Sequence, residues 1–372
     1  MKPSTIQKYF GALPDPRTSN KRHCLIDIIT ISICAVISGA QTYEQIEEFG
    51  KDHYSWLDEF LELPHGIPSH DTFGRVYSMI DPRKFQNSFI KWIGAVSQLF
   101  DDDIVAIDGK TLRRSHDNAS NKKAIHMVSA WATAQNIVLG QYKTEEKSNE
   151  ITAIPILIKM LDISGTIVTI DAMGCQKKIA SLIIKKDADY VLSLKENHPE
   201  MYRNTKSYLD DLIQSGELGG DYKYHETFDG EHGRIETRRY WITSDINFLQ
   251  GKENWKGIAS IGRVERTREV GDEISVEMHY YIASIEDDAK LFAKAVRNHW
   301  GIENGLHWTL DMAFREDECR IRKGNAPENF AVLRHIAINL LKNETSHKGS
   351  INTKRLKASW NKEYLKKIIK YH

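Results

Sequence analysis

The sequence has few cysteines, no long apolar run and no excess of either charge. Its four cysteines are scattered along 372 residues without a C-x-x-C pair, which argues against a disulfide framework and against a cysteine-rich zinc module. The longest apolar run, from Leu25 to Ile37, contains Asp27 and is too short to span a bilayer, so it predicts a buried helix. The first ten residues, MKPSTIQKYF, lack the apolar stretch of a secretory signal. We therefore expect a cytoplasmic protein with reduced thiols and no membrane partner.

Charge is balanced in total but uneven along the chain. Lysine and arginine number 51, as do aspartate and glutamate. Residues 40–62 carry seven acids against one lysine, whereas residues 344–372 carry eight basic residues against two acids, and residues 110–123 carry five against one. Basic segments offset by an acidic helix suit a protein that binds a polyanion with only some of its faces. The alternative for each segment is ordinary solvated surface charge.

The spacing of apolar residues in the first half of the chain changes at Asp103. Residues 1–98 show helical spacing of apolar residues, with helix starts expected at Ser69 or His70 and at Asp81-Pro82. After Asp103, apolar β-branched runs alternate with amphipathic stretches. The expected strands are residues 103–108, 124–135, 137–144, 166–171 and 188–194, and the expected helices are 151–162 and 175–186. Because tight turns join antiparallel strands and helices join parallel ones, this order predicts an α/β layer with a mixed sheet.

The second half begins with β alternation. Residues 200–285 read as antiparallel strands with a hairpin turn at Gly271-Asp272. Residues 287–314 and 329–343 are strongly helical, and the last thirty residues read as a basic tail that frays.

Two acids follow buried strands of this expected sheet. Asp108 ends the run DIVAID, and Asp171 ends TIVTID. A single acid after a strand more often caps the following turn. Two acids at one edge of a sheet repel each other, and proteins usually place two carboxylates together where they bind a divalent cation. Two Mg²⁺ ions about 4 Å apart could activate an attacking oxygen and stabilise a leaving one in phosphodiester cleavage. A third oxygen ligand is needed, and the candidates are Glu303, Asp311 and the run 316–318, which we interpret as a solvated helix end.

The segment HWGIENGLHW, residues 299–308, allows a second interpretation. His299, Glu303 and His307 are four residues apart and would share one face of an α-helix, as in a zinc site. The segment lacks the H-E-x-x-H order, and no cysteine supports it, so we favour histidines that pack or bind phosphate. Trp300 and Trp308 are expected in the core rather than in base stacking.

Three long motifs contain the acids discussed above. They are IDGKTLRRS at residues 107–115, IVTIDAMGCQKKIASLIIKKDADYVLSLKENH at 167–198, and RNHWGIENGLHWTLDMAFREDECRIRKGNAPENFAVLRH at 297–335. These motifs resemble the DDE transposases of bacterial insertion sequences, in the ISAs branch of H-repeat-associated proteins. The N-terminal GALPDPR and GIPSHDTFGRVYSMIDP resemble that branch's associated region. The resemblance covers nearly the whole chain.

The resemblance implies an RNase H-like mixed-sheet core with an N-terminal helical domain and a β-rich insertion before the helix that bears the glutamate. It assigns metal binding and catalysis to Asp108, Asp171 and Glu303, with Mg²⁺ as cofactor and Mn²⁺ as a substitute. The expected domains are an N-terminal helical domain at residues 1–98, the first part of the catalytic core at 99–199, the insertion at 200–286, the helical second part of the core at 287–345 and a basic C-terminal tail at 346–372.

The implied reaction is hydrolysis at the element ends followed by attack of the freed 3′-hydroxyl on target DNA. The implied partners are the terminal inverted repeats, the target DNA and a second copy in a homodimer assembled on DNA, in a nucleoid-associated protein of the bacterial cytoplasm. The wider Y-x2-R-x3-E-x6-K signature falls on Val296, His299, Glu303 and Leu310, so only the acid is kept.

Seven basic residues are candidates for contacts to DNA phosphates: five lie close to Asp108 or Glu303 in the sequence, Lys195 comes at the end of the last expected core strand, and Arg234 lies in the expected insertion. They are Lys110, Arg113, Arg114, Lys195, Arg234, Arg297 and His299. Two alternatives share these features: a metal-dependent nuclease without strand transfer, and a transposase-derived DNA-binding protein that no longer transposes. The presence of all three acids argues against the second alternative.

Overall fold

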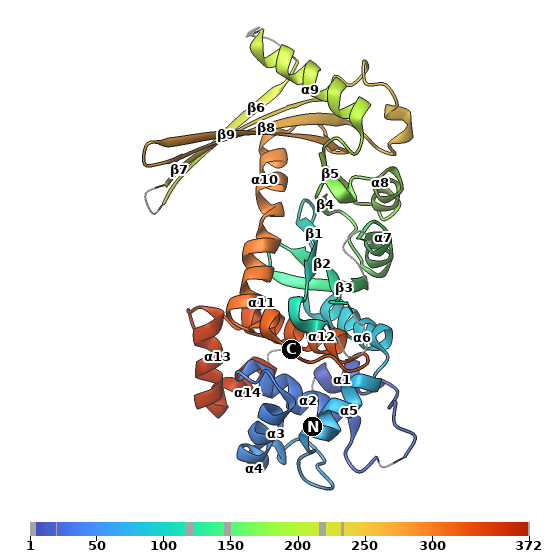
Figure 1. Cartoon of the computed structure of the whole chain (residues 1–372), viewed down its shortest axis with the longest axis vertical. Helices are drawn as coiled ribbons and strands as arrows, with labels where there is room; N and C mark the ends of the chain where they lie inside the picture. The colour runs from blue at the N-terminus through green and yellow to red at the C-terminus, as the bar shows by residue number, and fades with distance from the viewer. Residues whose placement is uncertain are drawn as a thin grey trace.

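A nine-stranded mixed sheet runs through the molecule (Figure 1), in the order β3-β2-β1-β4-β5-β9-β8-β7-β6. The computed structural model describes residues 5–19, 21–116, 123–144, 150–215, 221–231 and 234–370. Its strands are β1 (Ile104–Thr111), β2 (His126–Ala132), β3 (Ile137–Thr144), β4 (Ile167–Ile170), β5 (Asp189–Leu194), β6 (Lys223–Glu231), β7 (Arg234–Thr243), β8 (Ser260–Val270) and β9 (Glu273–Ala283).

The first five strands form the core that the sequence predicts. β1, β2 and β3 are antiparallel neighbours, whereas β1, β4 and β5 run parallel. The parallel strands are joined by α7 (Glu150–Met160) and α8 (Lys177–Ile184), as parallel pairs require. All four residues of β4 are buried, as expected for a strand covered on both faces. This order and these directions confirm the RNase H-like mixed-sheet core.

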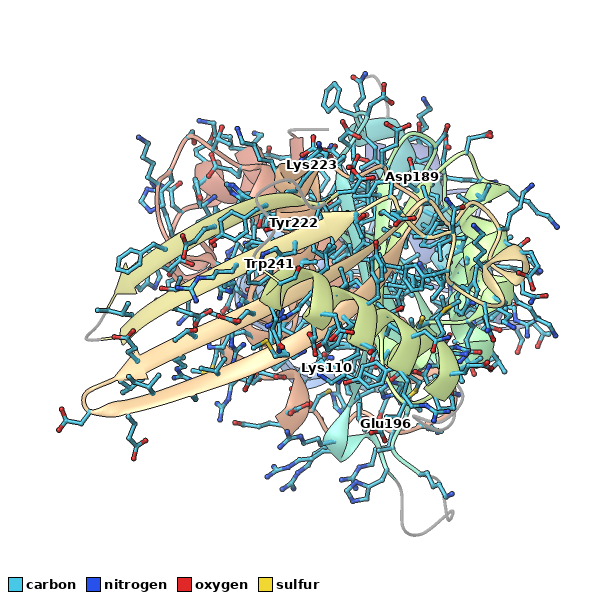
Figure 2. The ribbon with its side chains drawn as sticks, turned by 90° about the horizontal axis from the view of Figure 1, so that it is seen from above. Lys110, Asp189, Glu196, Tyr222, Lys223 and Trp241 are labelled. Atoms are coloured by element: carbon cyan, nitrogen blue, oxygen red, sulfur yellow. The ribbon has the colours of Figure 1, made fainter. Side chains whose placement is uncertain are left out.

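The β-rich stretch continues the same sheet. β9 pairs antiparallel with β5, and β9, β8, β7 and β6 follow as an antiparallel arm. Figure 2 shows the four strands side by side with α9 (Pro199–Gln214) lying across them. This helix was missed by the sequence interpretation, although Met201, Thr205 and Leu209 repeat at helical spacing and form its buried face. The hairpin turn predicted at Gly271-Asp272 is confirmed between β8 and β9.

Helices of both ends of the chain pack together below the core in Figure 1. They are α1 (Thr5–Phe10), α2 (Leu25–Ile37), α3 (Tyr43–Asp52), α4 (Tyr54–Leu57), α5 (His70–Met79), α6 (Pro82–Val96) and α12 (Ala326–Asn343). The apolar run Leu25–Ile37 is a buried helix, as predicted, and α5 and α6 begin after the predicted caps Ser69 and Asp81. α12 is almost wholly buried and contacts α2, α5, α6 and β3, so it joins the N-terminal helices to the core sheet.

The end of the chain is folded, so the prediction of a fraying tail is wrong. It forms α13 (Ile351–Trp360) and α14 (Lys362–Lys370), which contact α2 and α12. Leu365 and Ile368 are fully buried, and the Arg355 guanidinium donates to the Val36 carbonyl at 2.9 Å. These apolar residues lie at helical spacing between lysines, and the basic composition concealed that pattern. No helix in the described part of the chain is long and apolar enough to cross a membrane.

The two faces of the core sheet are covered by different helices. α10 (Ala289–His299) covers one face, where Phe292 packs with Ile104 of β1 and Ile167 of β4 in one apolar cluster. α7 and α8 cover the opposite face with the main core. The segment that carries Glu303 therefore continues a helix that lies directly on β1 and β4.

Candidate active site

The register of the two central parallel strands places Asp108 beside Asp171. Ile107 of β1 is paired with Ile170 of β4, so the next residue of each chain is one of the two acids. Neighbouring strands are about 4.8 Å apart, and paired positions of parallel strands face the same side. Asp171 ends β4, and its Oδ1 accepts the backbone N–H groups of Met173 and Gly174 at 3.0 and 3.2 Å.

Asp108 does not end its strand, contrary to the prediction from DIVAID. β1 continues to Thr111 because β2 continues to pair with it, through Asp108 with Ser129 and on to Thr111 with His126. Only the pairing with β4 stops at Ile107. Asp108 is thus the first residue of β1 that is paired with β2 but no longer with β4, and it lies just beyond the end of the β1–β4 pairing.

The third acid lies on a turn that is not α-helical. α10 ends at His299, and Glu303–His307 form a π-helical turn, η5, before α11 (Trp308–Met312). A π turn changes the angular spacing of side chains, so His299, Glu303 and His307 do not form the single α-helical face that the zinc interpretation requires. His299 Nδ1 lies 3.0 Å from Thr169 Oγ1 of β4, whereas His307 Nδ1 lies 3.6 Å from Asp108 Oδ2.

The structure as described holds no group of three or more His, Cys, Asp or Glu side chains close enough together to bind one metal ion. His299 and His307 do not form such a group, because the His299 ring contacts Thr169 of β4 and the His307 ring contacts Asp108 of β1.

The electrostatics of Asp108 link all three acids. Burial raises the pKa of Asp108, the Gly109 backbone N–H lowers it, and the carboxylates of Asp171, Glu150 and Glu303 raise it; together these effects bring the pKa to about 7. Burial also lowers the pKa of His307 to about 4, so its contact with Asp108 is not an ion pair at neutral pH. Asp108 is therefore influenced by three carboxylates, and among the described residues it makes no ion pair with a lysine or arginine.

Glu150 is an acid that sequence reasoning missed. It is the first residue of α7 and is buried, with Oε1 2.5 Å from His126 Nε2, whose ring Nδ1 contacts Thr111 Oγ1 at 2.8 Å. Gly109 permits this arrangement, because a Cβ there would clash with both His126 and Glu150. The sequence feature that points to Glu150 is the glycine directly after Asp108. The two side chains that pack against Gly109, His126 and Glu150, lie 17 and 41 residues further along the chain.

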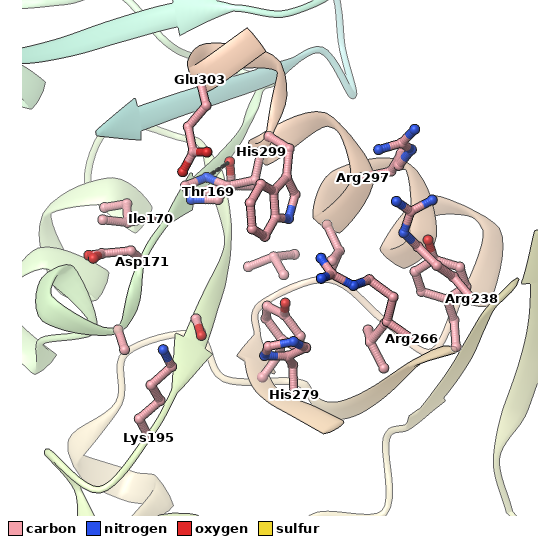
Figure 3. A pocket seen from close by; sticks show the side chains of 18 residues that line it. Thr169, Ile170, Asp171, Lys195, Arg238, Arg266, His279, Arg297, His299 and Glu303 are labelled. Carbon is pink, nitrogen blue, oxygen red and sulfur yellow. Dashed lines mark hydrogen bonds between the residues drawn. The ribbon is translucent and has the colours of Figure 1, made fainter. Parts of the chain in front are cut away.

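One cavity of about 260 Å³ joins the core to the arm (Figure 3). Its walls include five predicted site residues, namely Asp171, Glu303, Lys195, Arg297 and His299. The arm adds two arginines that the sequence interpretation did not single out, Arg238 of β7 and Arg266 of β8. The apolar part of the wall comes from Tyr240, Tyr281, Val191, Val264 and Val296.

The three arginines of this cavity are paired with acids of the arm. Arg238 is paired with Asp229 at 2.8 Å, and Arg297 of α10 approaches the same carboxylate at 3.4 Å. Arg266 is paired with Glu277 at 3.2 Å. Burial lowers the pKa of His299, so its ring is neutral at neutral pH and contributes hydrogen bonding rather than charge.

The two tryptophans of HWGIENGLHW are exposed, so the prediction that they pack in the core is wrong. Trp300 is 41% exposed and Trp308 is 62% exposed. The Arg266 guanidinium lies 5.8 Å from the centre of the Trp300 ring, a cation–π distance. The core positions of this segment are taken by Ile302, Leu306 and Leu310 instead.

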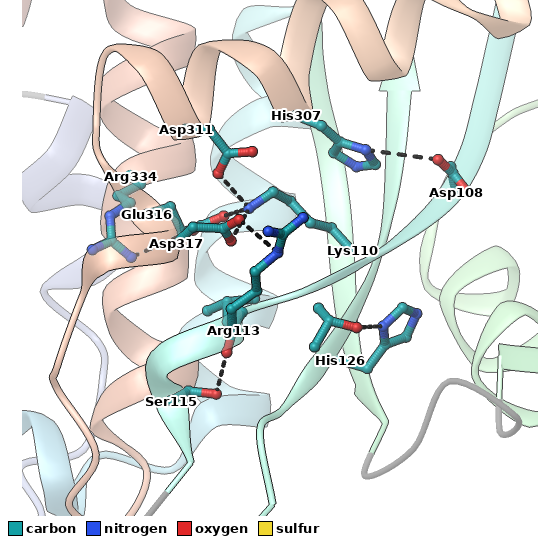
Figure 4. Close-up of polar contacts among 12 residues, drawn as sticks. Asp108, Lys110, Arg113, Ser115, His126, His307, Asp311, Glu316, Asp317 and Arg334 are labelled. Atoms are coloured by element: carbon teal, nitrogen blue, oxygen red, sulfur yellow. Dashed lines mark hydrogen bonds and ion pairs between the residues drawn. The ribbon is translucent and has the colours of Figure 1, made fainter.

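Lys110, Arg113 and Arg114 do not line the cavity, and Figure 4 shows Lys110 and Arg113 among acids instead. Lys110 is only 11% exposed and is paired with Asp311, Glu316 and Asp317. Arg113 is 80% exposed and reaches Asp317 at 3.1 Å, and Arg114 is exposed next to it. Arg234 begins β7, and its side chain lies outside the described part of the chain.

The run 316–318 is not a solvated helix end as expected. Glu316 is buried, and its carboxylate contacts Lys110 and Arg334 at 3.2 and 3.4 Å.

Family models and similar proteins both indicate the same family for this chain. A family described as "Transposase DDE domain" matches residues 99–340, and one described as "DDE_Tnp_1-associated" matches residues 7–93. The H repeat-associated putative transposase YhhI of Escherichia coli (strain K12) is 41% identical over 371 residues, covering 98% of this chain and 97% of its own. The putative transposase YncI of Escherichia coli O157:H7 is also 41% identical, covering 98% of this chain and 94% of its own.

Among solved structures, the cryo-EM structure of the piggyBac transposase synaptic complex with hairpin DNA covers 98% of this chain and 77% of its own. Its TM-score is 0.43 at 12% identity. A likeness at this level supports no argument about the present site.

An RNase H-like sheet, with Asp108 and Asp171 next to the end of the pairing between its central parallel strands, and a family match over most of the chain define a transposase. The chain belongs to the DDE transposase family, with H-repeat-associated transposases among its relatives. Membership of this family implies use of a divalent metal ion.

Proposed function

We propose that this protein is a DDE transposase that cleaves DNA at the ends of an insertion sequence and joins the freed 3′-hydroxyl to target DNA. Asp108, Asp171 and Glu303 are the proposed catalytic and metal-binding residues. The proposed metal is Mg²⁺, with Mn²⁺ as a substitute. Because each of two element ends needs an active site, the proposed DNA-bound form is a homodimer, in a nucleoid-associated protein of the bacterial cytoplasm.

The observation that carries the proposal is the position of Asp108. The β1–β4 register puts it beside Asp171, and the carboxylates of Asp171 and Glu303 raise its pKa. A buried carboxyl group near other carboxylates, which no described lysine or arginine neutralises, is costly to ionise. A bound divalent cation would remove that cost, which is how such groups of acids are ordinarily used.

The donor set fits the proposed metal, because it consists of carboxylate oxygens, which Mg²⁺ prefers. Bound ions would activate the attacking oxygen and stabilise the leaving oxygen of an in-line displacement. The chain's own contribution is to hold the acids and the DNA in place. His299, fixed by Thr169 and neutral, keeps the start of the Glu303 turn against β4.

The cavity beside Asp171 and Glu303 is the proposed binding site for the DNA backbone. Lys195 and Arg297 line it, as do Arg238 and Arg266 of the arm. Four cationic side chains around one opening attract phosphate groups, and arginine can bind them through two hydrogen bonds. Lys110 is not part of the proposed contact, since it does not line this cavity and its ammonium makes ion pairs with three carboxylates elsewhere.

Isosteric variants of the three acids test the proposal. Asp108→Asn, Asp171→Asn and Glu303→Gln should each slow Mg²⁺-dependent cleavage of element-end DNA by about 10²–10³-fold or more, as for loss of a group that stabilises transition-state charge. Binding of the same DNA should change little. Glu196→Gln, at an exposed acid just beyond β5, is the matched control and should cleave at the wild-type rate. Wild-type cleavage by all three acid variants would refute the proposed site.

A second assay separates the alternative functions. A pre-cut element end supplied with Mg²⁺ and target DNA should be joined to that target by the wild-type protein. Cleavage without joining would indicate a nuclease, and binding without either reaction would indicate a DNA-binding protein derived from a transposase.

A further inference from the structure

Lys110 is the centre of a partly buried ionic cluster next to the proposed active site. Its Nζ lies 2.7 Å from Asp311, 3.0 Å from Asp317 and 3.2 Å from Glu316. Figure 4 shows the lysine pointing from β1 into this group of acids. Three short contacts use all three donors of an ammonium group.

Two arginines complete the cluster. Arg334 of α12 approaches Glu316 at 3.4 Å, and Arg113 approaches Asp317 at 3.1 Å. Three cations thus balance three carboxylates in a region where an unpaired buried charge would be strongly destabilising. Removing Lys110 would therefore leave its acidic partners to rearrange.

The cluster connects the two segments that carry proposed catalytic acids. Lys110 is two residues after Asp108 in β1, so both side chains point to the same face of the sheet. Asp311 belongs to α11, which begins directly after the π turn Glu303–His307. The lysine therefore ties the strand of the first acid to the helix that follows the third acid.

The π turn itself needs such support. Its i→i+5 hydrogen bonding is rare and occurs mainly as single turns inside α-helices. On its inner side the turn rests on Trp131 of β2, where a Cβ at Gly305 would lie only 3.0 Å from the ring. The Lys110 cluster holds the following helix from the other end.

We propose that Lys110 is a positioning residue that sets Glu303 relative to Asp108, rather than a contact to DNA phosphate. The proposal rests on the proposed function for the role of the two acids. The link itself is a property of the contacts between Lys110, Asp311 and β1.

Lys110→Met is the test variant, measured in the full-length protein. Amide hydrogen exchange of residues 303–312 should become faster, because the helix after the turn loses its anchor. Mn²⁺ affinity, measured by calorimetry without DNA, should fall about 10–100-fold, the usual effect of losing a group that supports metal ligands. Lys110→Arg keeps the charge and should recover part of both losses.

Lys354→Met is the matched control. Lys354 is 7% exposed, and its ammonium donates to the carbonyls of Leu341 and Glu344 at the end of α12. The substitution removes a buried ammonium of the same kind at a distance from the acids. It should lower the unfolding temperature while leaving Mn²⁺ affinity and exchange of residues 303–312 unchanged.

The salt dependence of DNA binding separates positioning from phosphate contact. A lysine that contacts phosphate contributes about 0.9 to the slope of log K against log salt concentration. Lys110→Met should leave that slope unchanged. A slope smaller by about 0.9 with unchanged exchange at residues 303–312 would overturn the proposal, as would unchanged exchange together with unchanged Mn²⁺ affinity. If the wild-type protein binds no Mn²⁺, the proposed three-acid site fails, and the exchange of residues 303–312 alone decides whether Lys110 positions the turn.

Discussion

Replacing Asp108 by asparagine should make the metal-free protein more stable at neutral pH while removing its activity. The pKa of Asp108 is raised from 3.8 to about 7, first by burial and then by Asp171, Glu150 and Glu303. A pKa difference of about three units at about 1.4 kcal/mol each sets an upper limit of roughly 4 kcal/mol for the cost of ionising this carboxyl group in the folded state. Asparagine keeps the shape and carries no charge.

The sign of the pH dependence follows from the direction of the shift. The folded protein binds the Asp108 proton more tightly than the unfolded chain does, because its pKa is higher in the folded state. This stabilisation is fully present below about pH 4 and is lost as the pH rises through about 7. Wild type and Asp108→Asn should therefore be equally stable near pH 4. At pH 8 the variant should be more stable, by up to roughly 4 kcal/mol.

The assay is urea unfolding of both proteins in EDTA at pH 4, 6 and 8, followed by circular dichroism and compared at equal m-values. Asp58→Asn, at an exposed aspartate, is the control and should show no such pH-dependent gain. Adding Mg²⁺ at pH 8 should then stabilise the wild type by mass action and leave Asp108→Asn unchanged. A variant that is no more stable than the wild type at pH 8 would refute the reasoning, because it would mean that the carboxylate is well solvated.

Two further substitutions test the packing around the site and at the end of the chain by urea unfolding. Gly109→Ala should destabilise the fold by about 1–3 kcal/mol, because the added methyl group overpacks the His126–Glu150 pair. The control is Gly94→Ala in α6, where a Cβ meets nothing within 4 Å, and it should stabilise the fold by about 0.5–1 kcal/mol. Equal effects of the two substitutions would contradict the close packing at Gly109. Arg355→Met should cost about 2–3 kcal/mol, since its guanidinium donates to backbone carbonyls of two other segments; an unchanged unfolding midpoint would mean that α13 is not held in place.

The parts of the fold that sequence predicted well are those set by local pattern. Apolar β-branched runs located the core strands, and β3 spans residues 137–144 as expected. Ser69 and Asp81 marked helix starts because a cap acts on its own first turn. The error in β1 has a non-local cause, since its last residues are strand only because β2 pairs with them.

The site could be predicted only in part, for the same reason. Asp108 and Asp171 follow apolar strands, so the pattern before each acid identifies it. Lys110 follows the same motif, but its three acidic partners are about 200 residues away, and no local signal distinguishes an internal ion pair from a phosphate contact. Trp308 directly follows the π turn, which changes the helical phase assumed from the sequence.

The position of Glu303 follows from the direction in which the chain leaves the arm. β9 runs antiparallel to β5 and ends at Ala283, beside Val191 near the beginning of β5. The chain therefore re-enters the core where the parallel strands start, opposite the edge where the acids lie. From there the helical segment follows β1 in the same direction: Lys294 contacts the Asp102 carbonyl at 2.7 Å, and further along it His307 and Asp311 meet Asp108 and Lys110.

The helical segment from Lys294 to Asp311 advances by seventeen residues at about 1.5 Å each, and the strand from Asp102 to Lys110 advances by eight residues at about 3.3 Å each. The two segments therefore cover nearly the same length and remain side by side. The arm thus contributes arginines and also determines where the chain re-enters the core. By returning the chain at the starting edge of the sheet, the arm lets α10 and the π turn that follows it run along β1, so that Glu303 lies near the acids at the other edge.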